Sequence, residues 1–354
     1  DAWLASSGVG KTFLDEKTLL VVDEAGQLSS RQMHAVLSEV ARAGAKLVLV
    51  GDRRQLQPIG AGGALSIVAR ATDFARVDKI VRQKDEWARQ ATMALAAGRT
   101  HEALTAYGER GHVHLHSGQK AAVRAMVDAW EQAATRQEGQ ELLLLARTHA
   151  QLRIINAEIR SRLREAGALR GPEISMDAVT ASGHPHQIDL AVGDEVRFLM
   201  RHDRLGVING STGIVTSISS GKESDGPRIA ASVDGRHISF TPSDLADESG
   251  RARLSHAYAS TIYGGQGLTA DRTFVLLDPA CNRHDAYVGL SRARETTEIF
   301  ADSRLIDVGI RAELPLSERA AADSASVRLT ILPFAFFGSA STKRIRRGTL
   351  NGAS

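Results

Sequence analysis

The chain has 354 residues, of which 43% are hydrophobic and 24% are charged, a composition that suits a soluble globular protein of two or three domains at about 150 residues each. No apolar run approaches the roughly 20 residues that a membrane helix needs and no secretory signal is visible, so we expect a cytoplasmic location. The single cysteine, Cys281, excludes an internal disulfide and a multi-cysteine zinc site, while the small excess of bases, +3, permits a nucleic-acid partner without requiring one.

The first part of the chain predicts a strand–helix–strand unit. Residues 18–24 and 46–52 are apolar runs that end in acidic residues. Between them, residues 29–43 show apolar side chains at helical spacing, with Ser29 or Ser30 as the N-cap. Continuous apolar strands joined by a helix indicate a parallel sheet that is covered on both faces.

The middle of the chain predicts a second α/β region. Helical spacing covers 85–106 and 119–137, and the apolar run 142–146 is followed by a helix over about 149–166. Residues 190–245 then change character. Their short alternating runs, separated by Gly, Asn-Gly, Asp-Gly and Pro, are typical of a small antiparallel barrel or meander.

After about 252 the α/β pattern returns, with a strand at 272–277 and a helix near 285–294. The β module is therefore predicted to be inserted into a second α/β domain. Residues 316–354 read as a disordered tail that ends in the basic cluster KRIRRG. A solvated tail is favoured there over a nucleic-acid contact.

Two acidic strand ends carry the strongest chemical signal. VVDEAG at 21–26 and LVGDRRQLQPI at 49–59 place Asp23 and Asp52 at the carboxyl ends of strands joined by one crossover. Ligands of open parallel sheets bind at that edge. An aspartate there can hold Mg²⁺ on a nucleotide phosphate, and a neighbouring glutamate can orient or deprotonate the attacking water.

These two segments resemble motifs II and III of superfamily 1 helicases of the RecD type. VRQ at 81–83 resembles the arginine segment that follows motif III, YASTIYGGQGLTAD at 258–271 resembles motif V, and YVGLSRARE at 287–295 resembles motif VI. The order and spacing agree over roughly 1–312. The chain is most similar to the helicase half of MobF-type conjugative relaxases, the TraA and TrwC kind, truncated at the N-terminus.

The resemblance implies an α/β fold of two RecA-like P-loop NTPase lobes, the first incomplete, with an SH3-like β-barrel inserted in the second. The implied boundaries are 1–110 for the partial first lobe, 111–188 and 252–312 for the second lobe, 189–251 for the barrel, and 313–354 for the disordered tail.

The resemblance also implies roles at the nucleotide. Asp23 would coordinate Mg²⁺, Glu24 would be the base for water, and Asp52 would lie at the nucleotide. Gln55 would sense the γ-phosphate of ATP. Arg82 and Arg292 would reach the same phosphate, where a guanidinium is always charged and forks onto phosphate oxygens.

Four further residues belong to the motif V segment. Thr261 and Tyr263 would lie near single-stranded DNA, while Gln266 and Gly267 would couple the strand to the ATP site. The triplet Tyr263-Gly264-Gly265 departs from the His-Lys-Ser or similar triplet common in motif V, because it lacks a basic residue. That departure bears on the DNA contact rather than on the identity of the motif.

Two other patterns resemble functional sites but are better explained by ordinary structural roles. ASSGVGKT at 5–12 fits a relaxed phosphate loop with Lys11 and Thr12, but too little chain separates it from the strand at 18–24 for a crossover helix. A polar loop is favoured, and we expect this chain alone to hydrolyse ATP poorly. His112, His114 and His116 share one strand face; an exposed surface is favoured there over a metal site or a nicking motif.

The sequence therefore predicts an ATP- and Mg²⁺-dependent translocase on single-stranded DNA, 5′ to 3′ by resemblance, which acts as a monomer. Other conjugation or DNA-processing proteins are further candidate partners. Two alternatives stay open: a free-standing RecD-like repair helicase, and a non-catalytic helicase remnant that only binds DNA or a partner.

Overall fold

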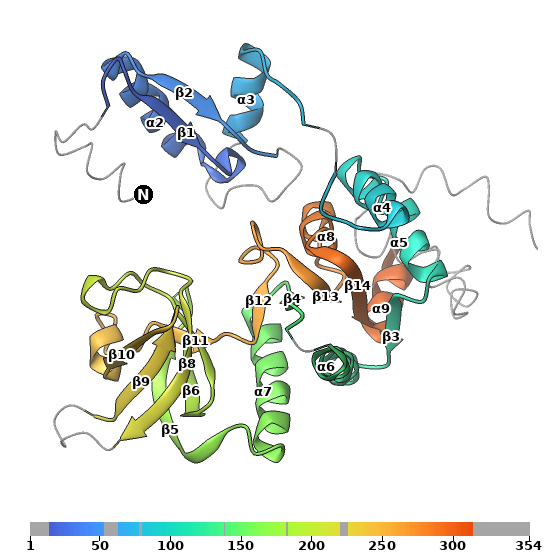
Figure 1. The fold of residues 1–354 in the computed structure, drawn as a ribbon. Coiled ribbons are helices and arrows are strands. Elements are labelled where there is room, and N and C mark those ends of the chain that lie inside the picture. Colours follow the sequence, from blue (N-terminus) through green and yellow to red (C-terminus); the bar gives the residue numbers. More distant parts are fainter. Residues whose placement is uncertain are drawn as a thin grey trace, which may run out of the picture. The chain divides into compact units, whose positions relative to one another are not determined.

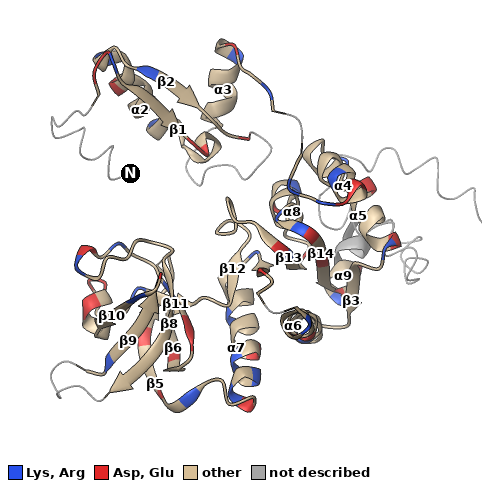
Figure 2. Ribbon diagram, viewed as in Figure 1, with Lys and Arg blue, Asp and Glu red and all other residues tan. Residues whose placement is uncertain are grey.

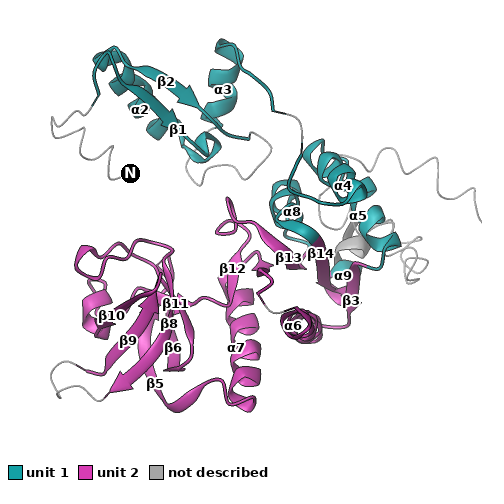
Figure 3. Ribbon diagram, in the orientation of Figure 1, with its two compact units in different colours: residues 1–111, 279–295, 306–354 teal, residues 112–278, 296–305 magenta. Residues whose placement is uncertain are grey.

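A computed structural model describes residues 14–52, 63–77, 80–137, 139–181, 183–219 and 226–313. Its contacts divide the chain into two compact units (Figure 3). Unit 1 comprises 1–111, 279–295 and 306–354, and unit 2 comprises 112–278 and 296–305. Each unit is described by itself.

Unit 1 begins with the predicted strand–helix–strand motif (Figure 1). Strands β1 (Leu19–Val22) and β2 (Lys46–Leu49) pair in parallel, and helix α2 (Ser30–Ala43) connects them. Ser29 is the N-cap of α2, where its side chain accepts from the Gln32 amide in a capping box. Of the four apolar residues at helical spacing, Met33, Val36 and Val40 are buried, whereas Leu37 is 38% exposed.

The remaining elements of unit 1 are mostly helical. They are η1 (Ala25–Gln27), α3 (Ala64–Ala71), α4 (Glu86–Ala96), α5 (Thr100–Glu109), α8 (Arg283–Leu290) and part of α9 (Ser303–Glu313). The helical character predicted over 85–106 is confirmed, and the region consists of two helices because the chain breaks between α4 and α5. Gly98 adopts a φ of 76° there, a conformation that ends the first helix.

Unit 2 contains a five-stranded sheet in the order β12-β4-β13-β14-β3. Strands β12 and β13 both pair in parallel with β4, and β14 pairs in parallel with β3. The bounds are β3 (Val113–His116), β4 (Leu142–Ala146), β12 (Ala259–Thr261), β13 (Ala270–Leu277) and β14 (Ala293–Asp302). Helices α6 (Gln119–Arg136) and α7 (His149–Glu165) pack on this sheet through a shared apolar core.

Residues of both charges occur along α7 (Figure 2). Arg162 of α7 forms ion pairs with Asp128 and Glu131 of α6 and with Glu158 of its own helix. The outer face of this helix pair is therefore polar. Across the described part of the chain, no helix combines the length and apolar character required to cross a bilayer.

The antiparallel module of unit 2 has two sheets. Strands β5 (Arg170–Val179) and β6 (Pro185–Val192) form one hairpin. The other sheet has the order β10-β9-β8-β7-β11. Its strands are β7 (Glu195–Phe198), β8 (Thr212–Ser219), β9 (Arg228–Val233), β10 (Arg236–Phe240) and β11 (Leu254–His256), with short helices η2 (Asp203–Leu205) and η3 (Pro242–Leu245).

The two sheets of the module share one core, which includes Met176, Leu190, Phe198 and Phe240. The antiparallel strands therefore begin at β5, earlier than the alternating runs at 190–245. The module's antiparallel character agrees with the prediction. Its SH3-like character and the boundaries drawn from the sequence remain predictions.

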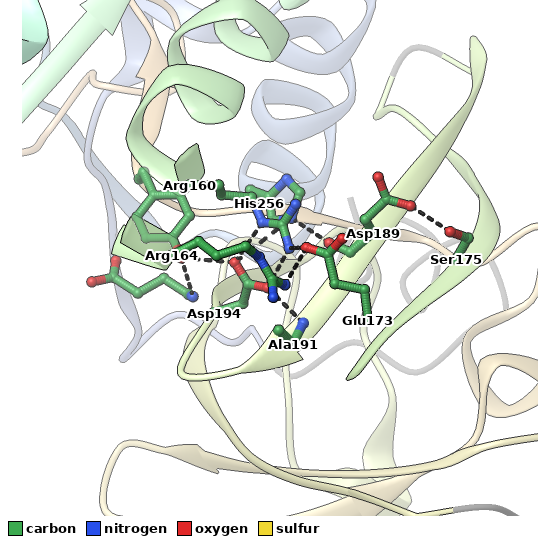
Figure 4. A network of polar contacts seen from close by, with 10 residues as sticks. Arg160, Arg164, Glu173, Ser175, Asp189, Ala191, Asp194 and His256 are labelled. Atoms are coloured by element: carbon green, nitrogen blue, oxygen red, sulfur yellow. Dashed lines mark hydrogen bonds and ion pairs between the residues drawn. The ribbon is translucent and has the colours of Figure 1, made fainter. Parts of the chain in front are cut away.

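A buried carboxylate attaches the module to α7 (Figure 4). Asp194 is fully buried and receives two hydrogen bonds from Arg160 of α7, at 2.8 and 2.9 Å. The hydroxyl of Tyr258 donates to the same carboxylate at 2.8 Å, and the Ala191 amide does so at 2.7 Å. A charge buried in this way is stable only because it is paired and hydrogen-bonded. The start of β7 is thus fixed against both α7 and the segment that enters β12.

Candidate active site

The loop that follows β1 carries the two acidic residues predicted to act on the nucleotide. Glu24 adopts a left-handed backbone conformation with a φ of 50°, and its amide donates to Oδ1 of Asp23 at 2.8 Å. The Ala25 amide bonds to the carbonyl of Val50 at 2.8 Å, which joins this loop to the end of β2. A left-handed glutamate is uncommon, and such strain is concentrated at functional sites.

Close backbone packing holds the two strand ends together. A Cβ atom added to Gly51 would lie 2.9 Å from the amide nitrogen of Gly26 and 2.9 Å from Cδ2 of Leu65. A Cβ atom on Gly26 would lie 3.2 Å from the carbonyl oxygen of Asp52. Glycine at both positions therefore allows the segment with Glu24 to lie against the segment with Asp52.

Asp52 is bound by a residue from far along the chain. The hydroxyl of Tyr287, on α8, donates to Oδ2 of Asp52 at 2.8 Å. This bond joins the predicted motif III aspartate to the first residue of the predicted motif VI. Both residues belong to unit 1.

Arg292 lies directly after α8 and is 2% exposed. Its Nε donates to the carbonyl of Val288 at 2.9 Å and its Nη2 donates to Oγ of Ser291 at 3.0 Å. Burial, and next the positive charge of Arg82, lower the pKa of Arg292 to about 10; Tyr287, Glu24 and Asp52 act in the opposite direction. The guanidinium thus remains charged at neutral pH.

Arg82 and Gln83 are attached to the same segment. Nη1 of Arg82 donates to the carbonyl of Ser291 at 2.8 Å. Nε2 of the buried Gln83 donates to that carbonyl at 3.0 Å and to the carbonyl of Ala293 at 3.1 Å. Burial lowers the pKa of Arg82, and the negative charge of Glu24 acts against this shift. The two predicted arginines are therefore held by neighbouring backbone groups.

A buried cation, Arg292, next to a partly buried one, Arg82, favours an anion. Among the described residues, neither Arg82 nor Arg292 forms an ion pair with a carboxylate. Burying a charge without a paired partner is costly. A polyphosphate would supply the missing negative charge, and the fork of each guanidinium matches phosphate oxygens.

The loop carboxylates fit a hard cation. Asp23 is exposed, and its one side-chain hydrogen bond among the described residues uses Oδ1. Oδ2 is therefore open to Mg²⁺, which prefers carboxylate oxygen together with substrate phosphates and water.

Two residues of this cluster were missed by sequence reasoning as individuals. Tyr287 begins YVGLSRARE and Gln83 ends VRQ, so both lie within segments that were identified. The signal for each was its position in the motif. Their partners, a carboxylate and two backbone carbonyls, are separated from them by more than 200 residues, and only the fold shows those contacts.

The residues predicted near DNA lie in unit 2, at the end of β12. Oγ1 of Thr261 accepts from the Gly264 amide at 2.8 Å. Tyr263 is 40% exposed, and Gly267 has a φ of 77°. Gln266 lies between them on the same loop and is partly buried.

Three predicted residues, Lys11, Thr12 and Gln55, lie outside the described residues. The chain just after Lys11 and Thr12 is described from residue 14, where a turn closed by the Thr18 amide on the carbonyl of Asp15, at 3.0 Å, leads into β1. The predicted tail 313–354 lies outside the described residues from 314 on.

The histidine strand is not the exposed face that the sequence suggested. His112 and His114 both contact the carboxylate of Glu298, at 3.2 and 2.9 Å, and His114 stacks on Phe300. Glu298 and Phe300 of the neighbouring strand β14 lie beside these histidines, so the side chains are half-buried, which an alternating pattern alone does not reveal. Within the described ranges, no group of three or more metal-ligating side chains occurs.

Comparison with known proteins gives a consistent result. A family model described as an AAA domain matches residues 1–118. The chain is 33% identical over 299 residues to the conjugal transfer protein TraA of Rhizobium radiobacter, a match that spans 83% of this chain and 25% of that protein. It is 24% identical over 286 residues to the ATP-dependent RecD2 DNA helicase of Deinococcus radiodurans, across 78% of this chain and 35% of that helicase.

A solved structure shares the fold. Pif1 of Bacteroides bound to single-stranded DNA superposes with a TM-score of 0.52 at 20% identity, and the match covers 85% of this chain and 75% of that one. This likeness confirms the predicted α/β class with parallel sheets. The chain spans about a quarter of the length of the TraA relative.

Proposed function

We propose that this chain is the motor segment of a RecD-like superfamily 1 helicase, because it is similar to a conjugal transfer protein TraA and to an ATP-dependent RecD2 DNA helicase. In that role it couples ATP hydrolysis to movement along single-stranded DNA, in the 5′ to 3′ direction that the resemblance implies. The Pif1 structure bound to single-stranded DNA supports the choice of that partner.

The observation that carries the proposal is the arginine pair. Arg82 and Arg292 are separated by most of the chain, yet both bond to the Ser291 region within unit 1. Their pKa values are influenced by Glu24, at the end of β1. This arrangement supports a site in which acidic loop residues and two guanidinium groups face one triphosphate.

Each proposed role follows from side-chain chemistry. Asp23, through its open oxygen, would hold Mg²⁺, which supplies charge neutralisation at the phosphates when bound. Glu24 would accept a proton from the attacking water. Arg82 and Arg292 would stabilise the charge that develops on the transferred phosphoryl group. Gln55 would contact the γ-phosphate, and Asp52 would position this loop through Tyr287.

The motif V loop supplies the proposed DNA contacts. The hydroxyl of Thr261 and the exposed ring of Tyr263 suit a strand that is bound without base preference, because hydroxyls bind phosphate and rings stack on any base. Gln266 and Gly267 would couple DNA binding at this loop to the state of the nucleotide.

The decisive experiment measures whether nucleotide changes DNA affinity. The probe is fluorescein-labelled oligothymidylate, titrated with the chain in the presence and absence of Mg²⁺ and a non-hydrolysable ATP analogue. We expect the analogue to change the dissociation constant and Arg292→Ala to abolish that change. Arg228→Ala, which removes the same charge from an exposed residue of the antiparallel module, is the matched control. Equal DNA affinity in both conditions for the unchanged chain would favour the passive DNA-binding alternative.

A further inference from the structure

The motif V loop lacks the basic residue that its family pattern carries, since Tyr263-Gly264-Gly265 holds no cation. A DNA phosphate at this loop would still require a positive partner, because phosphate contacts dominate the binding of nucleic acids. The question is whether another element of unit 2 brings a cation to the same place.

Arg197 of β7 is such a cation. Its Nη1 donates to Oγ of Ser260 at 3.0 Å, and Ser260 directly precedes Thr261 in β12. Arg197 alternates along β7 with the buried residues Val196 and Phe198, so its side chain leaves the core of the module on the opposite face and reaches β12.

The guanidinium of Arg197 has unused capacity. It carries five N–H donors, and within the described residues its side chain makes that one hydrogen bond and no ion pair. Burial lowers the pKa of Arg197, and the charge of Glu195 opposes the shift. A partly buried cation without a paired anion is unfavourable unless a ligand supplies the anion.

The loop beside Arg197 is built for a close backbone approach. A Cβ atom on Gly264 would lie 2.9 Å from Oγ of Ser260 and 3.0 Å from Oγ1 of Thr261. Glycine at this position therefore lets the loop lie against the two hydroxyl groups without displacing them. The result places a guanidinium, the Thr261 hydroxyl and the exposed ring of Tyr263 along one short stretch of β12 and its loop.

The position of Arg197 is fixed in advance. Asp194, the residue just before β7, is bound by Arg160 of α7 (Figure 4) and by Tyr258, which precedes β12. The anchor therefore ties β7 to both neighbours of the site. A cation held in this way loses little conformational freedom when it binds a phosphate.

We propose that Arg197, from the inserted module, binds a backbone phosphate of single-stranded nucleic acid beside the motif V loop and replaces the cation that this loop lacks. The assignment rests on the proposed function, which it deepens by naming a contact. The ligand is the phosphodiester group itself, so the contact is independent of base sequence.

The test compares Arg197→Ala with Arg228→Ala, which removes the same charge from an exposed position of the same module. The affinity for fluorescein-labelled oligothymidylate is measured over a range of salt concentrations. We expect Arg197→Ala to weaken binding about tenfold and to reduce the slope of log K against log salt by about 0.7. Arg228→Ala should change neither quantity.

Further variants separate a contact from a merely structural role. Arg197→Lys should keep the salt slope, because it keeps a point charge near the strand. If Arg197→Ala lowers the melting temperature but leaves affinity and slope as in Arg228→Ala, the assignment is overturned while the proposed function stands. If the unchanged chain binds no oligothymidylate, the proposed function fails, and this assignment fails with it.

Discussion

At the scale of single residues, the phenol of Tyr287 is the least expected part of the candidate site. Its hydroxyl is a neutral donor to a carboxylate, and hydrogen bonds to charged groups are stronger than those between neutral groups. It ties Asp52 to α8 without adding charge among the arginines. A neutral tie suits a place where the positive charge of Arg82 already lowers the pKa of Arg292.

Tyr287→Phe removes only that hydroxyl. We expect the free energy of unfolding to fall by about 1–2 kcal/mol, because the bond to Asp52 is lost while the ring stays. Urea denaturation followed by circular dichroism measures the change. Tyr263→Phe, which removes a hydroxyl from a 40% exposed ring, is the control and should have no effect. Equal stability of Tyr287→Phe and the unchanged chain would contradict the bond.

Gly51→Ala tests the close packing of the two strand ends. The added methyl group would collide with the backbone of Gly26 and with Leu65, so we expect a loss of about 1–3 kcal/mol. Gly111→Ala is the comparison, since Gly111 has a φ of 76° and open space around it. It should lose only the conformational cost, about 1 kcal/mol. Chemical denaturation measures the free energy of unfolding of both variants. A smaller loss of stability for Gly51→Ala than for Gly111→Ala would refute the packing argument.

At the scale of elements, the contact between β3 and β14 predicts a pH dependence. Burial alone would raise the pKa of Glu298, but hydrogen bonds from His112 and His114 outweigh it and hold the pKa at about 2, against an ordinary value of 4.5. A carboxylate whose pKa is lowered by folding stabilises the fold at pH values above its pKa in the unfolded chain. This contribution, up to about 3 kcal/mol, should be lost as the pH falls from 4.5 to about 2.

Glu298→Gln should remove that dependence. Thermal melting between neutral and acid pH should show a smaller acid-induced decrease in melting temperature for this variant than for the unchanged chain. The exposed Glu248→Gln provides a control with the same chemical change. Parallel curves for all three proteins would show that Glu298 does not carry the effect.

The turn at residues 15–18 bears on the apparent phosphate loop. A working loop is followed by a helix whose N-terminus binds phosphate, whereas the described chain enters β1 from a turn. We therefore expect Lys11→Ala to leave the nucleotide affinity of this chain unchanged, as measured with a fluorescent ATP analogue. Arg82→Ala is the positive control and should weaken binding. Loss of binding in Lys11→Ala would restore Lys11 as a phosphate ligand.

Local patterns predicted the elements better than the contacts. The capping box at Ser29, the strand at 142–146 and the helix after Thr148 follow from periodicity and cap chemistry. The break at Gly98 was not predicted, because the helical spacing of apolar residues continues across it. The contacts of His112 and His114 with Glu298 were not predicted because β14 comes from nearly 200 residues away, and alternation defines a face of a strand without identifying the neighbouring strand.

The sequence predicted the charged residues of the candidate site but not their hydrogen-bond partners. Its charged residues came from motif order, and unit 1 gathers Glu24, Asp52, Arg82 and Arg292. Their roles at the nucleotide remain predictions. The contacts of Tyr287 and Gln83 could not be predicted. Hydrogen bonds to a carboxylate or carbonyl far along the chain produce no periodic pattern in the sequence.

At the scale of the whole molecule, a motor requires that the nucleotide and the DNA influence each other's binding. Linkage makes that influence reciprocal. If the ATP analogue tightens DNA binding by a given factor, DNA should tighten binding of the analogue by the same factor, which is about 5 to 150 in typical coupled systems. Titrating a fluorescent analogue with and without oligothymidylate measures the second factor. Unequal factors would mean that the two titrations report different states.

The carbonyl of Ser291 accepts hydrogen bonds from Arg82 and from Gln83, and the hydroxyl of the same residue accepts from Arg292. Ser291 thus accepts hydrogen bonds from two arginines that are 210 positions apart in the sequence. In the proposed role, a displacement of Ser291 would disturb the hydrogen bonds of both cations at once, so we expect Arg82 and Arg292 to engage and release a phosphate together. Departure of the cleaved phosphate would then be a single kinetic event rather than a staggered one.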